Sequence, residues 1–314
     1  MGSTALSRQL WVVTCLVNSK GPSLDALTTC LSEFLKKAEL TFRVVPVQSM
    51  VLGIERNGPC LYVDNILETN LPRLAFVFIP ITGLFPTHMV HAVRHLETLG
   101  VRCVNTSQAM MVCRNKFHQM QILSKQGIPM PDTVTYATLT SHGLRDAVNA
   151  PHSVTFPVVL KNPNSSKGRG VMLLHTADTA RDIRHSLKDK NVYLLQRYVQ
   201  ESHGRSVRVV VIGRTVHGIY RNLNRDCTRV QTYSAQGTME IIEGDQDLKT
   251  RALQITELLG LDIAGLDFLE DASGERLFIE ANANPSMKLK YPKVAEAIAE
   301  YCVDALKKME VVEK

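Results

Sequence analysis

A change in the order of secondary-structure signals constrains the fold of this chain more than any single motif. Up to about residue 105, apolar strand-like runs alternate with amphipathic helical segments, which is typical of a parallel sheet with crossover helices. After about residue 131, strand-like runs follow one another through short turns, which favours antiparallel pairing. The expected fold class is therefore α/β in the N-terminal part and α+β in the remainder.

The N-terminal part is expected to contain two helices between its strands. Ser23 should cap the first helix, and Pro86 should begin the second. A further helix is expected from Arg114 to about Gln126, where a Gly-Ile-Pro-Met-Pro segment ends it. The expected strands of this part are 10–16, 42–47, 74–79 and 101–104.

The C-terminal part is expected to be a series of strands with helices at 178–188 and 248–259 and a last helix from Pro292. It ends with a hairpin, because turn residues at 271–274 separate two strand-like runs. The expected strands are 158–161, 171–175, 192–198, 207–212, 215–220, 238–242, 265–269 and 278–284.

Composition narrows the classes of protein. The 314 residues are 45% apolar and 21% charged, which is ordinary for a globular protein with two or three domains. No run of about 18 apolar residues and no signal-peptide layout occurs, so no membrane association is expected. The seven cysteines are scattered, which suits the cytoplasm. The net charge of +6 suits an anionic substrate, but no Lys/Arg run indicates nucleic-acid binding.

The hairpin carries a candidate metal site. Glu280 and Asn282 are two residues apart, so their side chains leave the same face of a strand, and Asp267 can meet them from the partner strand. Two carboxylates and an amide oxygen are the hard ligands that Mg²⁺ accepts when phosphates fill its other positions. The alternative is a hairpin whose polar face simply meets water.

Two lysines are candidates for phosphate binding. Lys161 ends an apolar strand, where an unpaired ammonium group would be costly, and a polar loop rich in Gly, Ser and basic residues follows it. Lys116 lies at a helix start, where the helix dipole disfavours a cation unless an anion is nearby. The alternatives are a flexible hairpin loop and a solvated surface lysine.

Two further segments could contribute to a site. The strand end Gln196–Val199 can offer backbone groups to an adenine edge. Arg208 lies in an apolar strand and Arg221 at the end of the next one, so the two could share a pocket and bind carboxylate or phosphate. The other arginines of this region are expected to face solvent.

Taken in order, these blocks resemble the RimK-type carboxylate–amine ligases of the ATP-grasp superfamily, from about Leu74 to Leu306. The motifs are Arg114–Lys116, Pro157–Lys161, Gln196–Arg208 and Ile279–Asn284, and the second and third look closest to the animal branch that joins glutamate to N-acetylaspartate or citrate. The resemblance implies an N-terminal pre-ATP-grasp domain and an ATP-grasp fold of two α+β subdomains. The implied bounds are 1–108, 109–190 and 191–314.

The resemblance also implies a role for each candidate residue. Asp267, Glu280 and Asn282 would bind Mg²⁺, which Mn²⁺ could replace; Arg208 and Arg221 would be catalytic and stabilise the transferred phosphoryl group. Arg221 and Asn284 would meet the substrate. The residues implied to bind ATP are Lys116, Lys161, Ser165, Ser166, Lys167, Gly168, Gly170, Gln196, Tyr198, Val199 and Ser206.

The implied reaction is phosphorylation of a carboxylate by ATP, followed by attack of an amine on the acyl phosphate. The substrates would be a small carboxylate and an amino acid, most simply glutamate; a homo-oligomer is left open. One alternative is a ligase that adds glutamate to a protein tail, and another is a nucleotide-binding regulator without turnover. The altered stretch 226–240 motivates the first alternative, and this stretch together with Ser206, which replaces an acidic residue, motivates the second. A further departure from relatives lies at 285–287.

Overall fold

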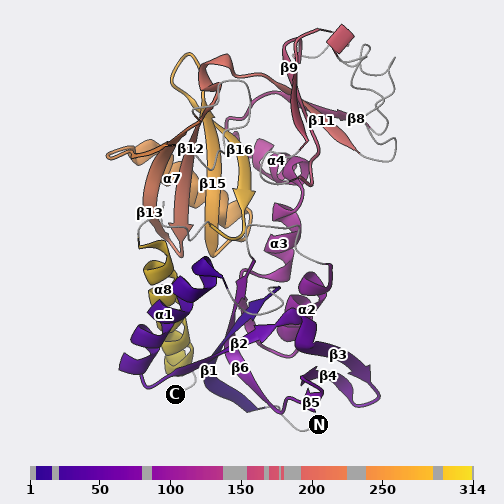
Figure 1. Cartoon of the computed structure of the whole chain (residues 1–314), viewed down its shortest axis with the longest axis vertical. Coiled ribbons are helices and arrows are strands. Elements are labelled where there is room, and N and C mark those ends of the chain that lie inside the picture. The colour runs from indigo at the N-terminus through magenta and orange to yellow at the C-terminus, as the bar shows by residue number, and fades with distance from the viewer. Residues whose placement is uncertain are drawn as a thin grey trace.

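Four β-sheets occur in the part of the chain that the computed structural model describes. The described residues are 5–15, 21–79, 87–136, 154–165, 170–176, 178–179, 192–224, 238–285 and 293–312. Figure 1 shows the N-terminal sheet at one end of the molecule and two antiparallel sheets at the other, with α3 and α4 between them. The expected fold class is confirmed.

The N-terminal sheet is parallel throughout, in the order β2-β1-β6-β7. Its first helix, α1 (Pro22–Lys37), begins one residue before the expected cap; Gly21 occupies the N-cap position without a side-chain hydrogen bond, so the predicted cap at Ser23 is wrong. The second helix, α2 (Thr87–Thr98), covers the opposite face. The strands are β1 (Ala5–Thr14), β2 (Thr41–Pro46), β6 (Asn70–Phe78) and β7 (Arg102–Val104).

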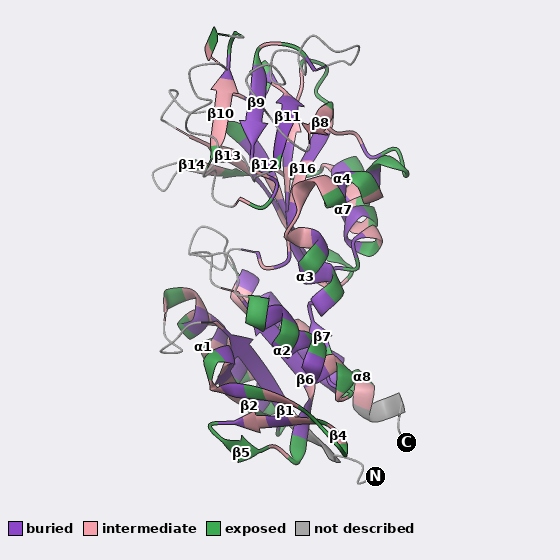
Figure 2. Cartoon of the chain, turned by 90° about the vertical axis from the view of Figure 1, so that its right-hand side faces the viewer, coloured by how far each residue is buried: buried purple, intermediate pink, exposed green. Residues whose placement is uncertain are grey.

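A small antiparallel sheet between β2 and β6 was not expected from the sequence. It contains β3 (Met50–Glu55), β4 (Gly58–Val63) and β5 (Ile66–Leu67), in that order, after a 3₁₀ turn at Val47–Ser49. Its apolar residues are not all buried: Ile54 is 80% exposed and Ile66 69% exposed. Figure 2 shows this mixture of buried and exposed positions. The alternation of apolar and polar residues that predicts a half-buried strand is therefore weak in this segment.

The helix expected from Arg114 forms and begins two residues later than expected, and a short helix that was not expected precedes it. The two helices are α3 (Ser107–Cys113) and α4 (Lys116–Ser124). Asn115 separates them, because its side-chain oxygen accepts hydrogen bonds from the amides of Phe117 and His118 and so caps α4. The cap makes Lys116 the first residue of α4.

The central sheet has the order β10-β9-β11-β8, and all its pairs are antiparallel. The strand β9 (Val158–Lys161) has the expected bounds and is buried along its whole length. The other strands are β8 (Thr133–Tyr136), β10 (Val171–Leu174) and β11 (Tyr193–Arg197). Of the helix expected at 178–188, all but residues 178 and 179 lies outside the described residues.

The C-terminal sheet has the order β14-β13-β12-β15-β16 and contains the expected hairpin. The turn at 271–274 forms as expected, because Asp271 Oδ1 accepts from the amides of Ser273 and Glu275 and Gly274 has a φ of 84°. The helix α7 (Gln246–Leu258) packs on one face. The strands are β12 (Arg205–Ile212), β13 (Thr215–Leu223), β14 (Thr238–Ile241), β15 (Ile263–Glu270) and β16 (Arg276–Asn282).

The last helix, α8 (Val294–Val312), returns to the N-terminal sheet. It packs against α1 and also contacts β1, β6 and β12 (Figure 1). Ile298 and Cys302 are fully buried in a core that includes Leu27 of α1 and Val210 of β12. The C-terminal helix therefore joins the first and last parts of the chain in one core.

Asn105, directly after β7, connects the N-terminal sheet to the C-terminal one. It is 2% exposed, and its side-chain nitrogen donates to the carbonyls of Ile263 and Ala283. Its side-chain oxygen accepts from the amides of Asp262 and Ile263 at 2.8 and 3.0 Å. One buried amide thus holds the start of β15 and the segment after β16 in place.

We expect Asn105→Ala to lower the free energy of unfolding by about 2–5 kcal/mol, because it leaves several buried backbone groups without a partner. Urea denaturation followed by circular dichroism measures this. Asn70→Ala, at an exposed strand position, is the control and should change stability by less than about 0.5 kcal/mol. Equal effects of the two substitutions would contradict the role of Asn105.

Candidate active site

The hairpin β15–β16 brings the three candidate metal ligands together. Asp267 and Glu280 are direct partners in the register of the two strands. Asn282 lies two residues further, and its side-chain nitrogen is 3.2 Å from Asp267 Oδ2 and 3.4 Å from Glu280 Oε1. The expectation that these three side chains share one face is confirmed in the geometry.

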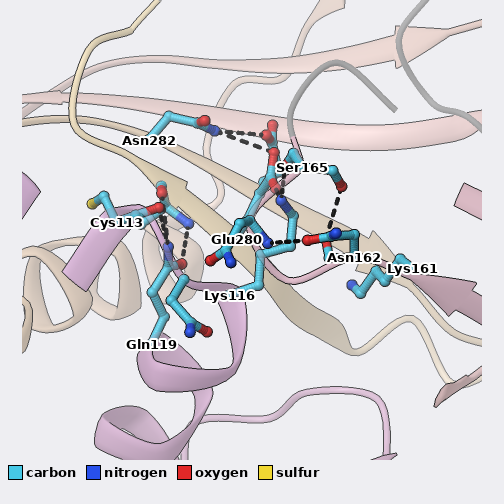
Figure 3. A network of polar contacts seen from close by, with 12 residues as sticks. Cys113, Lys116, Gln119, Lys161, Asn162, Ser165, Glu280 and Asn282 are labelled. Atoms are coloured by element: carbon cyan, nitrogen blue, oxygen red, sulfur yellow. Dashed lines mark hydrogen bonds and ion pairs between the residues drawn. The ribbon is translucent and has the colours of Figure 1, made fainter. Parts of the chain in front are cut away.

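Each of the two carboxylates is paired with a cation from another element. Arg208 of β12 stands opposite Asp267 in register, and its Nη2 is 3.1 Å from Asp267 Oδ2. Lys116 Nζ, at the start of α4, is 2.9 Å from Glu280 Oε2 (Figure 3). The side chains of Asp267 and Glu280 remain 20% and 22% exposed, so both carboxylates have limited access to solvent.

The two carboxyl groups differ in their protonation. Burial raises the pKa of Asp267 to about 7, and the neighbouring Glu280 adds to this while Arg208 opposes it. Burial also acts to raise the pKa of Glu280, but the positive charges of Lys116, Lys161 and Arg208 outweigh it and the pKa is lowered. The pair therefore holds one firm negative charge on Glu280 and a carboxyl group on Asp267 that titrates near neutrality.

Lys161 is the third cation of the cluster and is only 4% exposed. Its ammonium group donates to Gln196 Oε1 at 2.9 Å, a neutral partner that does not compensate its charge. Burial, and then the like charge of Lys116, lower the pKa of Lys161 to about 7, although Glu280 acts in the opposite direction. A bound anion would restore the charged form.

The loop after β9 reaches α4. The backbone amide of Lys116 donates to the carbonyl of Pro163 at 3.1 Å, and Lys116 Nζ donates to the carbonyl of Ser165. The Ser165 hydroxyl is turned back to the carbonyl of Asn162, as Figure 3 shows. Gly170, where the loop ends, has a φ of 66°. The predicted loop residues Ser166, Lys167 and Gly168 lie outside the described residues.

The predicted adenine segment lies at the end of β11. Gln196 also donates to Thr133 Oγ1 at 2.7 Å, so it connects Lys161 to β8. Tyr198 is held by a 2.7 Å hydrogen bond to His203 Nδ1, and Val199 is 2% exposed. Ser206 is 6% exposed on β12. Their roles in nucleotide binding stay predictions.

Arg221 does not join Arg208, which corrects the expectation of a shared pocket. In the β12–β13 register Arg208 stands opposite Tyr220, whereas Arg221 stands opposite Val207 and so belongs to the other face of the sheet. Arg221 instead approaches Glu240 at 3.9 Å and Glu270 at 3.8 Å. Its side chain is 38% exposed, and period-2 alternation along β13 explains the separation.

Asn284 lies just beyond β16 and contacts the N-terminal sheet. Its side-chain nitrogen donates to the carbonyl of Val77 at 2.8 Å. The predicted substrate residue thus lies where the end of β6 meets the segment after β16, the strand that carries two of the candidate metal ligands. The stretches 225–237 and 286–292, which include most of the departures from relatives, lie outside the described residues.

The sequence analysis did not identify Gln119 and Asn105, although both contact the strand ends of the site. Gln119 is fully buried on α4, three residues after Lys116, and bonds to the backbone of Ala281. A polar residue on the buried side of a short helix was the only available signal. Which backbone groups it would meet depends on long-range packing.

The cluster suits Mg²⁺ and a nucleoside triphosphate. Two carboxylates and an amide offer hard oxygen donors, and Mg²⁺ is usually held by one or two carboxylates with phosphates completing the coordination. Lys116 and Lys161 lie beside these donors, where a polyphosphate would bind. For Asn282 to contribute, its amide must turn, because its nitrogen now faces the two carboxylates.

Comparisons with known proteins identify the family. The model of the RimK-like ATP-grasp domain matches residues 113–306. Beta-citrylglutamate synthase B of Mus musculus is 32% identical over 309 residues, which cover 96% of this chain and 79% of that protein. N-acetylaspartylglutamate synthase A of Homo sapiens is 30% identical over 277 residues, covering 88% and 70%. The chain belongs to the RimK-like ATP-grasp family.

A solved structure supports the fold. The ATP-grasp ligase PsnB, in complex with a variant of its minimal precursor, Mg and ADP, superposes with a TM-score of 0.68 at 17% identity; the match covers 95% of this chain and 98% of that one. The family match and the curated relatives, not this fold likeness, identify the protein as an ATP-dependent ligase that forms carbon–nitrogen bonds, and binding of ATP and Mg²⁺ is typical of its family. No helix among the described residues is long and apolar enough to cross a membrane.

Binding of metal-free ADP should take up more protons at pH 8, up to about one, than at pH 6. Lys161, with a pKa of about 7, is largely neutral at pH 8 and becomes protonated beside a phosphate; at pH 6 it is already charged. ADP affinity should accordingly fall as pH rises from 7 to 9, by up to roughly tenfold per unit.

Calorimetry with EDTA, in two buffers of different ionisation enthalpy, measures this uptake. Lys161→Met should lose this proton uptake, because it removes the ammonium group that accepts the proton. The variant keeps Asp267, the other group with a pKa of about 7, so it shows which of the two is responsible. Uptake of the same size in Lys161→Met would show that another group, not Lys161, accepts the proton.

Proposed function

We propose that this enzyme joins glutamate to a small polycarboxylate through an acyl phosphate, using ATP and Mg²⁺. The observation that supports it most strongly is the opposed cluster of Lys116 and Lys161 against Asp267 and Glu280, in a chain of the RimK-like family. Phosphoryl transfer between two anionic groups requires such compensation of charge. The printed names of the relatives, beta-citrylglutamate synthase and N-acetylaspartylglutamate synthase, support glutamate as the amine.

In this mechanism Lys116 and Lys161 bind the phosphates. The bound Mg²⁺ would compensate negative charge on the phosphates during transfer, held by Asp267, Glu280 and Asn282. Lys116 now pairs with Glu280, so it would exchange this carboxylate for a phosphate oxygen when nucleotide binds. In the ligand-free enzyme the charges of Lys116 and Glu280 thus compensate each other, whereas Lys161 has only a neutral partner.

Arg208 stands next to the metal ligands on the adjoining strand and would stabilise the transferred phosphoryl group. The acyl donor's carboxylate oxygen forms a bond to the γ-phosphorus, and ADP leaves. The amine nitrogen then bonds to the acyl carbon, phosphate leaves with the electrons of the broken C–O bond, and the nitrogen gives up its proton. Asn284, between the hairpin and β6, would orient the acyl donor.

The ion pairs of Arg221 give it a different proposed role. Because it approaches Glu240 and Glu270 on the face that carries α7, it would link the ends of β13, β14 and β15 instead of contacting the phosphoryl group. A direct substrate role would require it to leave both carboxylates. The catalytic assignment therefore rests on Arg208.

We place the reaction in the cytoplasm, with Mn²⁺ able to replace Mg²⁺.

An assay across several acids would identify the acyl donor. A panel of N-acetylaspartate, citrate and related acids, each with glutamate, should release ADP for at least one pair. No ADP release across the panel, with Mg·ADP still bound, would count against a small-molecule ligase.

A protein acceptor is the competing proposal. Incubation of a lysate with ATP and labelled glutamate, followed by mass spectrometry, separates the two. Label confined to small molecules supports the proposal made here. Glutamate residues added to a polypeptide would support the competing one.

Glu280→Gln should lower kcat by at least about a hundredfold, because it removes a metal-ligand charge opposite Lys116. A coupled ADP-release assay measures it. Glu275→Gln, exposed in the turn of the same hairpin, is the matched control and should retain full activity. Turnover abolished only by the first substitution eliminates a regulator without turnover; turnover preserved in both would remove Glu280 from the mechanism.

A further inference from the structure

Gln119 uses its whole carboxamide in contacts with backbone groups. Its side-chain oxygen accepts from the amide of Ala281 at 2.7 Å, and its nitrogen donates to the carbonyl of Ala281 at 3.2 Å. The nitrogen also donates to the carbonyl of Cys113, the last residue of α3, at 3.0 Å. The residue is fully buried, and Figure 3 shows it beside the end of α3.

The partner of Gln119 is the residue between two metal ligands. Ala281 lies between Glu280 and Asn282 on β16, which is the edge strand of its sheet. Its amide and carbonyl point away from β15, where an edge strand would otherwise lack a neighbour. The carboxamide of Gln119 supplies one donor and one acceptor there, as the backbone of a neighbouring strand would.

Gln119 also lies on the same side of α4 as Lys116. Residues three apart on a helix are neighbours on its surface, so the two side chains leave α4 together. Lys116 contacts Glu280 while Gln119 contacts Ala281, the next residue along the strand. One turn of α4 therefore contacts two adjacent residues of β16.

We propose that Gln119 is a positioning residue, which fixes α4 to the backbone of β16 and so sets the distance between Lys116 and Glu280. This rests on the proposed roles of Lys116 with phosphate and Glu280 with Mg²⁺. The Lys116 side chain is long and flexible, and a salt bridge alone tolerates many geometries. Bonds from a short, buried carboxamide to fixed backbone atoms restrict the helix much more.

The test replaces Gln119 by methionine, which has a similar volume but cannot form these hydrogen bonds. Affinity for Mg·ADP, measured by calorimetry, should fall at least tenfold. Gln121→Met is the matched control on the exposed side of the same helix and should leave the affinity within twofold. Thermal unfolding of each variant shows whether the protein is folded at the assay temperature.

A double-mutant cycle with Lys116→Met separates positioning from general support of the fold. If Gln119 acts through Lys116, adding Gln119→Met to Lys116→Met should weaken Mg·ADP binding less than twofold further. If Gln119 only supports the fold, Gln119→Met should lower the unfolding temperature and leave the affinity for Mg·ADP within twofold. If Gln119 acts independently of Lys116, the fold-losses in affinity of the two single variants should multiply in the double variant. Either result overturns the proposal.

Gln119→Asn serves if the methionine variant does not fold, since it keeps the amide but is too short to reach β16. Loss of the fold in both variants would assign Gln119 to stability and overturn the proposal. The readout does not depend on the acyl donor or the amine. A wild type that turns over no acid–amine pair, yet shows the Gln119 effect on Mg·ADP binding, would reject the proposed substrates and keep the positioning role.

Discussion

The ion pair between Lys116 and Glu280 is the interaction on which the arrangement of the site depends. It joins Lys116, the first residue of α4, to Glu280 of β16 at 2.9 Å and so connects the residue proposed to bind phosphate with a residue proposed to bind Mg²⁺. In the free protein the ammonium group of Lys116 and the carboxylate of Glu280 compensate each other. A bound polyphosphate would require the same ammonium group, and a bound Mg²⁺ the same carboxylate. The fold therefore compensates these two charges even when no ligand is bound.

The rest of the structure holds these two elements against each other. Asn115 begins α4 at Lys116, Gln119 pairs with the backbone of β16, and Asn105 ties the start of β15 to the N-terminal sheet. On the other side, Arg208 balances Asp267 from β12. Buried amides that bond to backbone groups recur in this architecture, because a carboxamide can donate and accept at once without adding charge.

Much of this could be predicted from the sequence, for identifiable reasons. The strand β9 is a continuous apolar run ended by a lysine, so its bounds could be predicted. The β15–β16 hairpin has alternation and turn residues, so its polar residues could be placed on one face. Arg221 was misplaced because its face depends on register, and a shift of one residue reverses every side chain. The sheet β3–β5 was missed because exposed apolar residues such as Ile54 obscure the pattern. The contacts of Gln119 and Asn105 join segments more than 150 residues apart, which no local pattern encodes.

A crystal structure with Mg²⁺ and a non-hydrolysable ATP analogue tests the central claim most directly. It should show the Lys116–Glu280 pair separated beyond salt-bridge distance, with Lys116 and Lys161 on phosphate oxygens and both carboxylates on the metal. Nucleotide and Mg²⁺ bound with the 2.9 Å pair intact, and with Lys161 still on Gln196, would contradict it.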